Sequence, residues 1–397
     1  MRRVKSYTQM YANVPLYKSI RILNTISPAK IPLIPYNTKT HHIMDTLPIN
    51  TISIEGWKSI KKVEVTFGKI NILLGANGSG KSSFLSAFEL LEIIVNNPKY
   101  LPKYIEKNGG ANQNFHYGTK NTDHVMISID IEKRHNYSYF LMAGKDDNII
   151  LSDKADVDFY LSGITSVHSQ VAEFEKTPDL KEKLEELKNH FILYHFQDTG
   201  DASPLKRVSG ITQTRYLHPD GDNLAAILYE IKNTHSKSYE NIINAIRFAF
   251  PDFKDFIFHK TGDNVRLLWN DRYAEHYDFP LSALSDGTLR FIALSTLLLQ
   301  PNPPKFIIID EPELGLHPEA IEILAELIKL ASANSQLLIS TQSIQLVNSF
   351  TPDDILIAEK EHGETKITRP NKEELRDWLK DYTLGEIWRK NIMGGNP

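Results

Sequence analysis

The sequence contains no cysteine among its 397 residues. That absence excludes a disulfide framework, a thiolate zinc site and a cysteine nucleophile. The sequence also lacks the run of about 18 apolar residues that a membrane-spanning helix needs. Its N-terminal segment has no apolar stretch of the kind found in secretory signals. We therefore expect a cytoplasmic protein without a membrane partner.

Surplus charge of either sign is also missing, because 45 Lys and Arg residues face 49 Asp and Glu residues, for a net charge of −4. This balance does not favour wholesale binding to nucleic acid. Residues 1–48 differ, since they carry seven basic residues and one acid, Asp45. Prolines in this segment argue against long regular elements. Two interpretations stay open, an irregular leader or a basic arm for a nucleic acid or an acidic partner.

From residue 49 onward, strand and helix patterns alternate. Apolar strands are expected at 70–74, 306–309 and 336–340, each followed by a helical pattern or a turn. Three antiparallel strands are expected between 125 and 151. Helical patterns are expected at 82–96, 171–190, 224–248, 285–299 and 318–332. This alternation predicts an α/β fold.

A glycine-rich motif follows the first apolar strand and precedes a helix. It reads Gly75-Ala-Asn-Gly-Ser-Gly80-Lys81-Ser82 and matches G-x-x-x-x-G-K-[ST]. Glycines let several backbone N–H groups face a phosphate, and the helix N-terminus adds a favourable field. Lys81 would reach the β- and γ-phosphates, and Ser82 would ligate Mg²⁺. The motif predicts ATP and Mg²⁺ as cofactors, held by Asn77, Gly78, Ser79, Gly80, Lys81, Ser82 and Ser83.

A second motif places two carboxylates at the end of a buried strand. Residues 306–309 are apolar, and Asp310, Glu311 and Pro312 follow them. Ligands of open α/β sheets bind at the carboxyl ends of the strands. We expect Asp310 to hold Mg²⁺ and Glu311 to polarise the attacking water.

A third motif opens the apolar helix that precedes Asp310. It consists of Leu284-Ser285-Asp286-Gly287-Thr288. Alone it is also typical of an ordinary turn and helix cap. The order of phosphate loop, Leu-Ser-x-Gly helix start and strand ending in Asp-Glu is that of ABC-type ATPases.

Several segments resemble SMC/RecF-type ABC ATPases. Residues 54–67 resemble the opening of this group, in which a basic residue, here matched by Lys58, approaches the nucleotide. Other segments resemble the group's smaller defence-associated members, such as the ATPase component of Septu-type or retron-linked systems. These segments are 194–199, 221–225, 310–318 and 382–395.

The resemblance implies a two-lobed ABC-type ATPase head over residues 49–397, with a mixed sheet that carries the phosphate loop and a RecA-like core. One lobe would carry that sheet, and a lobe over 281–365 would hold the signature helix and the Asp310 strand. A helical lid would be inserted at about 155–250, and 366–397 would form a helical tail. No long coiled coil is expected, because no sustained heptads occur between the motifs.

The resemblance also assigns roles to residues outside the first two motifs. Gln197 would sense Mg²⁺ and the γ-phosphate. The signature would face the nucleotide of a second subunit through Ser285, Asp286, Gly287 and Thr288. Gln342 stands where many relatives carry a histidine, and an amide cannot titrate. We therefore expect slow, switch-like ATP hydrolysis.

Three functions remain open at this stage. The first is an ATPase switch that dimerises around ATP, or forms a higher oligomer, and controls a separate effector such as an anti-phage nuclease. The second is a RecF-like DNA-repair ATPase, for which nucleic acid would be a partner. The third is the nucleotide-binding subunit of a membrane transporter, which the SMC/RecF-like opening and Gln342 disfavour.

Overall fold

The computed structural model describes residues 49–131, 135–143, 149–155, 191–212, 215–274 and 276–395. The basic leader, the helix expected at 171–190 and part of the expected lid lie outside these residues. Of the helices described, α1 (Lys81–Asn96) is the longest, with 16 residues. No helix in the described part is long and apolar enough to cross a membrane.

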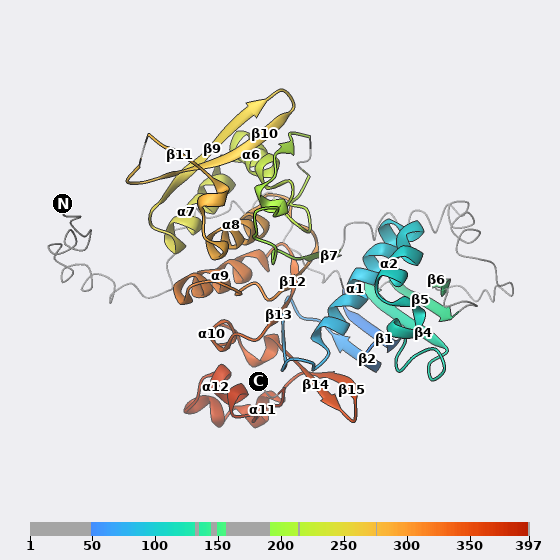
Figure 1. Ribbon diagram of the computed structural model, residues 1–397. Coiled ribbons are helices and arrows are strands. Elements are labelled where there is room, and N and C mark those ends of the chain that lie inside the picture. Colours follow the sequence, from blue (N-terminus) through green and yellow to red (C-terminus); the bar gives the residue numbers. More distant parts are fainter. Residues whose placement is uncertain are drawn as a thin grey trace, which may run out of the picture.

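A six-stranded sheet forms the centre of the molecule (Figure 1). Its strand order is β15-β14-β3-β13-β12-β7, and all neighbours pair in parallel except the antiparallel β14–β15 hairpin. β13 is buried at every position, as expected for a strand covered on both faces. The strands are β3 (Ile70–Leu74), β7 (Phe191–Tyr194), β12 (Phe306–Asp310), β13 (Gln336–Thr341), β14 (Ile355–Glu361) and β15 (Glu364–Thr368).

A second, antiparallel sheet covers one face of the central sheet through α1. Its order is β2-β1-β4-β5-β6. Phe67 and Phe88 of α1 pack against Phe306 of the central sheet, with ring centroids 5.5 and 5.6 Å away. Phe84 of α1 packs in turn on Phe67 and Phe88, at 6.5 and 5.5 Å. The elements on this side are β1 (Thr51–Trp57), β2 (Ile60–Thr66), β4 (His124–Ile131), β5 (His135–Ala143), β6 (Ile149–Ala155), α2 (Leu101–Lys107) and α3 (Gly110–Asn114).

Helices cover the opposite face of the central sheet. α8 (Asp286–Leu299) and α9 (Pro318–Ala331) lie against it, and α6 (Leu224–Thr234) and α7 (Ser236–Ala249) pack on α8 (Figure 1). Strand residues alternate between the two cores, since Ile307 faces this helical layer and Ile308 faces α1. An outer ribbon consists of β8 (Ser209–Gly210), β9 (Phe253–Thr261), β10 (Asn264–Asp271) and β11 (Asp278–Pro280).

One expectation about the lobes was wrong. The strand of Asp310, β12, was expected in a different lobe from the phosphate loop, yet β13 pairs with both β12 and β3, and all three lie in one sheet. The described part of the expected helical insertion, residues 191–212 and 215–250, packs on the central sheet. It contributes β7 to the central sheet, and its helices share one core with α8 and α9. Parallel pairing between distant segments leaves no local pattern in the sequence.

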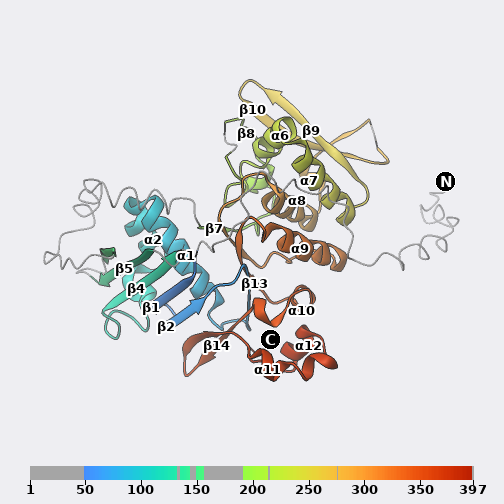
Figure 2. The ribbon, with the colours of Figure 1, turned by 180° about the vertical axis from the view of Figure 1, so that it is seen from behind.

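The C-terminal segment returns to the central sheet. After β15 it forms α11 (Lys372–Leu375) and α12 (Leu384–Arg389), which lie near α10 (Ile344–Val347) and β14 in both views (Figures 1 and 2). Its end is held by a hydrogen bond from the Gly395 backbone N–H to Glu359 of β14, at 2.6 Å. The tail expected to be helical from residue 366 onward begins in the structure with the end of β15.

Glu92 of α1 gives a prediction for stability. Burial raises the pKa of Glu92 from 4.5 to about 7, and the charge of Glu89 adds to this shift. A hydrogen bond from the Leu193 backbone lowers the pKa but does not cancel the rise. A raised carboxyl pKa means that stability present at low pH is lost as the pH rises through 7. Glu92→Gln should therefore be more stable than wild type at pH 8 by about 2 kcal/mol, and equal near pH 4.5.

Urea unfolding at both pH values measures this difference. The exposed Glu106→Gln, which makes the same charge change on α2, should stay within about 0.5 kcal/mol of wild type. An equal effect of Glu92→Gln at both pH values would contradict the prediction.

Candidate nucleotide-binding site

The glycine-rich loop between β3 and α1 is curled and supported from the β14–β15 hairpin. Gly80 adopts φ +104°, and a Cβ there would lie 1.9 Å from Oγ1 of Thr365. Only glycine fits this position. Thr365 Oγ1 in turn donates to the carbonyl of Ser79 at 3.2 Å and lies 2.8 Å from the hydroxyl of Ser59.

A cavity of about 350 Å³ opens beside this loop. Three strands, β3, β13 and β12, run in parallel, so the residues that follow them meet at one edge of the sheet. This arrangement brings the glycine-rich loop, the two carboxylates and Gln342 together. The cavity is lined by Ser59, Asn77, Gly78, Gly80, Lys81, Ser82, Ser83, Asp310, Glu311, Gln342 and Lys360.

Lys81 lies at the base of the cavity. Its ammonium donates to the carbonyl oxygens of Gly75 at 2.6 Å and Ala76 at 3.0 Å. An ammonium has three N–H donors, so one remains for a phosphate. Burial lowers the pKa of Lys81, and the carboxylates of Glu311, Asp310 and Glu313 oppose that shift.

The acidic wall of the cavity is held by β13. Asp310 Oδ1 accepts a hydrogen bond from the Ser340 hydroxyl, and the Glu311 backbone N–H donates to the Ser340 carbonyl at 3.0 Å. Glu311 adopts φ +45°, a left-handed conformation that is uncommon for a residue with a side chain. Gln342 Nε2 donates to Glu311 Oε1 at 2.5 Å. The amide therefore lies directly beside the carboxylate that was expected to activate water.

Glu313, which sequence reasoning did not single out, supports this wall. Its Oε1 accepts from the Thr341 hydroxyl at 2.6 Å and from the Gln342 backbone N–H at 3.2 Å. Burial raises the pKa of Glu313, and these hydrogen bonds oppose the shift. Glu313 thus fixes the turn that carries Gln342. The only hint in the sequence is its position two residues after the predicted pair.

The donor set suits Mg²⁺ bound together with a nucleotide. The hydroxyl of Ser82 and the carboxylate of Asp310 both line the cavity and are hard oxygen ligands. In the described ranges, no group of three or more His, Asp or Glu side chains could hold a metal alone. Mg²⁺ commonly takes one or two protein ligands and completes its shell with phosphate and water oxygens.

Outside the signature, three expected site residues do not line the cavity, namely Lys58, Ser79 and Gln197. Ser79 is buried within the loop. Lys58 lies at φ +48° in the β1–β2 turn with Nζ 5.1 Å from the centre of the Trp57 ring, and its neighbour Ser59 lines the cavity instead. Burial lowers the pKa of Lys58, and the Glu89 charge opposes that shift. Gln197 is exposed and follows β7, the edge strand beyond β12.

The signature residues form the start of α8 but do not line the cavity of their own chain. The Ser285 hydroxyl accepts from the Thr288 backbone N–H at 3.2 Å and caps the helix. A Cβ on Gly287 would lie 2.2 Å from the Gly315 carbonyl, so the helix start packs tightly on the loop after β12. Ser285 and Asp286 are exposed, whereas Gly287 and Thr288 are buried.

Arg290, also missed in the sequence, joins the signature helix to two loops. It is 5% exposed, and its guanidinium donates to the carbonyls of Phe196 at 2.9 Å, Gln197 at 3.1 Å and Leu314. The Gln197 segment and the loop after Glu311 are therefore tied to one residue of α8.

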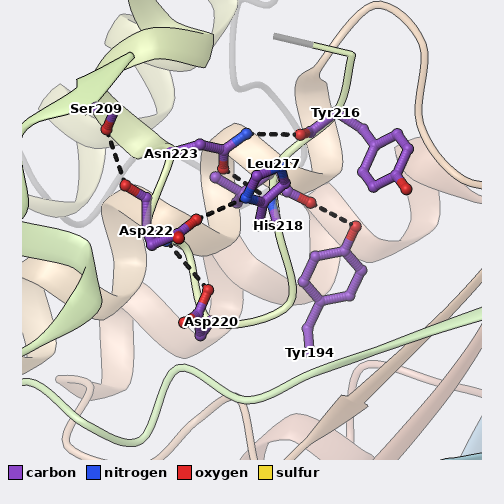
Figure 3. A network of polar contacts seen from close by, with 8 residues as sticks. All are labelled: Tyr194, Ser209, Tyr216, Leu217, His218, Asp220, Asp222 and Asn223. Carbon is purple, nitrogen blue, oxygen red and sulfur yellow. Dashed lines mark hydrogen bonds and ion pairs between the residues drawn. The ribbon is translucent and has the colours of Figure 1, made fainter. Parts of the chain in front are cut away.

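A network of hydrogen bonds holds the segment 216–223 against the end of β7 (Figure 3). Tyr194 donates to the Leu217 carbonyl at 2.9 Å, Asn223 Oδ1 accepts from the His218 backbone at 2.8 Å, and His218 Nδ1 lies 2.6 Å from Asp222 Oδ1. The contacts of Leu217 with Tyr194, and of His218 with Asp222 and Asn223, thus join the end of β7 to the start of α6.

Replacing Arg290 tests how strongly the two loops are held. Arg290→Ala would leave three carbonyls without their donor, one at a buried contact and two at partly buried ones. A buried group left unpaired costs about 1–3 kcal/mol, and a partly buried one costs less. We expect the free energy of unfolding in urea to fall by about 3 kcal/mol. Arg376→Ala, which removes an exposed arginine paired with Glu373, should change it by less than about 0.5 kcal/mol. A similar small effect of both variants would contradict this role for Arg290.

Two solved structures of SMC head domains resemble the fold. One is the SmcHead bound to the C-winged helix domain of ScpA, with a TM-score of 0.53 and 16% identity over 81% of this chain and 97% of that chain. The other is a Pyrococcus furiosus Smc head domain with an extended coiled coil, bound to the C-terminal domain of ScpA. Its TM-score is 0.51, with 15% identity over 84% of this chain and 99% of that chain. The expected α/β ATPase-head fold is confirmed.

No curated protein matches the chain. A family model does, and it is described as "AAA domain, putative AbiEii toxin, Type IV TA system" and matches residues 70–348. That match spans the glycine-rich loop, the signature, the two carboxylates and Gln342. The fold and the matched motifs agree on a P-loop ATPase of the SMC-like type, and the protein belongs to this AAA-domain family.

Proposed function

We propose that the protein binds and slowly hydrolyses ATP, dimerises around the nucleotide and thereby controls a separate effector. The observation that carries the proposal is that Lys81, Asp310 and Glu311, which come from separate segments, line the same cavity. A cation and N–H donors for phosphate lie on one side of it, and carboxylates for Mg²⁺ and water lie on the other.

The residues of this cavity divide the chemistry among them. Lys81 and the loop N–H groups would bind the phosphates, and Ser82 and Asp310 would hold Mg²⁺, which neutralises the phosphate charge. Glu311 would accept the proton of the attacking water. Gln342 holds Glu311 by its amide N–H but cannot take up a proton, which supports slow turnover.

Dimerisation would complete the site. The helix α8 has 14 residues, and Ser285 at its N-terminus is exposed. The N-terminus of a helix attracts phosphate. In our proposal, Ser285 to Thr288 act on the nucleotide held by the second subunit, and Gln197 joins them near the γ-phosphate. Loss of the γ-phosphate would weaken the contact, which gives the two states different interaction free energies.

The effector is proposed to be a separate protein, namely a nuclease of an anti-phage system. Support comes from the resemblance of residues 310–318 and 382–395 to defence-associated ATPases. The two similar SMC heads are each bound to a domain of another protein, ScpA. We further propose that residues 49–397 form one ATPase domain and that the basic leader is a separate segment.

Two substitutions separate binding from turnover. Lys81→Ala should abolish MgATP binding in calorimetry, because it removes the cation at the base of the cavity. Glu311→Gln should bind MgATP as wild type does but hydrolyse it roughly 10²-fold or more slowly, as expected for loss of a general base. Normal binding by Lys81→Ala would refute the site, and normal turnover by Glu311→Gln would assign the base to another group.

Mixing two inactive variants tests action between subunits. Ser285→Arg should bind ATP but fail to dimerise with it or hydrolyse it, because the arginine blocks the helix start. A mixture of Ser285→Arg and Lys81→Ala contains one composite site with an intact loop and an intact signature. We expect ATPase activity in the mixture and none in either variant by itself. Heterodimers that form without activity would contradict action in trans.

A further inference from the structure

β14 extends past the strand that carries the glycine-rich loop. Ile357 pairs with Leu74, the last residue of β3, and β14 continues to Glu361. This overhang lies along the loop, because a Cβ on Gly75 would be 2.5 Å from the Ala358 carbonyl. The end of β14 therefore forms a wall of the nucleotide cavity.

Lys360 stands on the face of this overhang that is turned toward the loop. It pairs with Thr365 across the hairpin, and directly paired residues of antiparallel strands point to the same side. Thr365 contacts the loop at Ser79 and Gly80, as described above. Lys360 itself lines the cavity and is exposed, and its ammonium makes no hydrogen bond or ion pair with any residue that the structure describes.

The strand order sets Lys360 opposite the carboxylates. β14 borders β3 on one side, whereas β13 and β12 follow on the other. Asp310 and Glu311 thus form one wall of the cavity and Lys360 the other. The other cation of the cavity is Lys81, and the charges of three carboxylates already act on its ammonium. A bound polyphosphate would carry its Mg²⁺ toward the carboxylates and present its remaining anionic oxygens to Lys360.

We propose that Lys360 is a second cationic ligand of the nucleotide's polyphosphate, on the wall opposite the Mg²⁺ ligands. This inference rests on the proposed ATP site. The ammonium would form a charge-assisted hydrogen bond to phosphate, and Lys often binds phosphate as a point charge. Its role is in binding affinity, since it stands away from Glu311 and the water that Glu311 would activate.

Calorimetric titration of the full chain with MgATP tests the proposal. Lys360→Gln should raise Kd roughly tenfold, in line with loss of one charged hydrogen bond. Lys360→Arg keeps the charge and should retain most of the affinity. The salt dependence of binding should also become shallower in Lys360→Gln, because one ion contact is lost.

Lys366→Gln is the matched control. Lys366 lies on the same hairpin, where it pairs with Glu359 and so points to the opposite face, and it forms an ion pair with Glu364 at 3.6 Å. This variant makes the same charge change and should bind MgATP as wild type does. Equal loss in both variants would show a general charge effect and overturn the proposal.

Lys81→Ala separates this inference from the proposed function. If Lys81→Ala abolishes binding while Lys360→Gln binds as wild type does, the ATP site stands and the role of Lys360 is wrong. If neither substitution changes Kd, the ATP site itself is wrong. Lys360 is exposed, so unchanged thermal unfolding of its variants will confirm that Kd reports binding rather than folding.

Discussion

Parallel pairing of β3, β13 and β12 is the interaction on which the candidate site depends. Each of these strands ends in a functional segment, and pairing in register brings the three ends to one edge. The pairing is possible because both faces of the sheet are covered, by α1 on one side and by α8 and α9 on the other. Packing of the apolar side chains that alternate between the two cores therefore sets the positions of the polar groups at this edge.

The loops at this edge are held by polar contacts that the core cannot supply. Arg290 binds three carbonyls of two loops, Glu313 holds the turn of Gln342, and Thr365 supports the glycine-rich loop. Buried groups of this kind must be paired, because an unpaired donor or acceptor costs free energy. Each contact thus fixes the geometry of one loop at this edge of the sheet.

Departures from the expected arrangement have local physical causes. Lys58 and Ser59 are adjacent in a tight turn, so only one of them can face the cavity, and the left-handed backbone at Lys58 gives that place to Ser59. β7 and β12 are distant in sequence, so the sequence pattern alone could not indicate that they pair. Residues 155–250 were expected to form a lid, and the helices of their described part, α6 and α7, share one core with α8.

The sequence by itself determined the glycine-rich loop with its helix, the buried strand ending in Asp310 and Glu311, and the helix start at Ser285. These features depend on contiguous residues, whose backbone preferences and apolar runs are local properties. Tertiary structure alone decided which strands share a sheet and that Lys360, Arg290 and Glu313 lie at or near the cavity. Those positions follow from strand register and from hairpin faces, and register between distant segments is set by packing of the whole core.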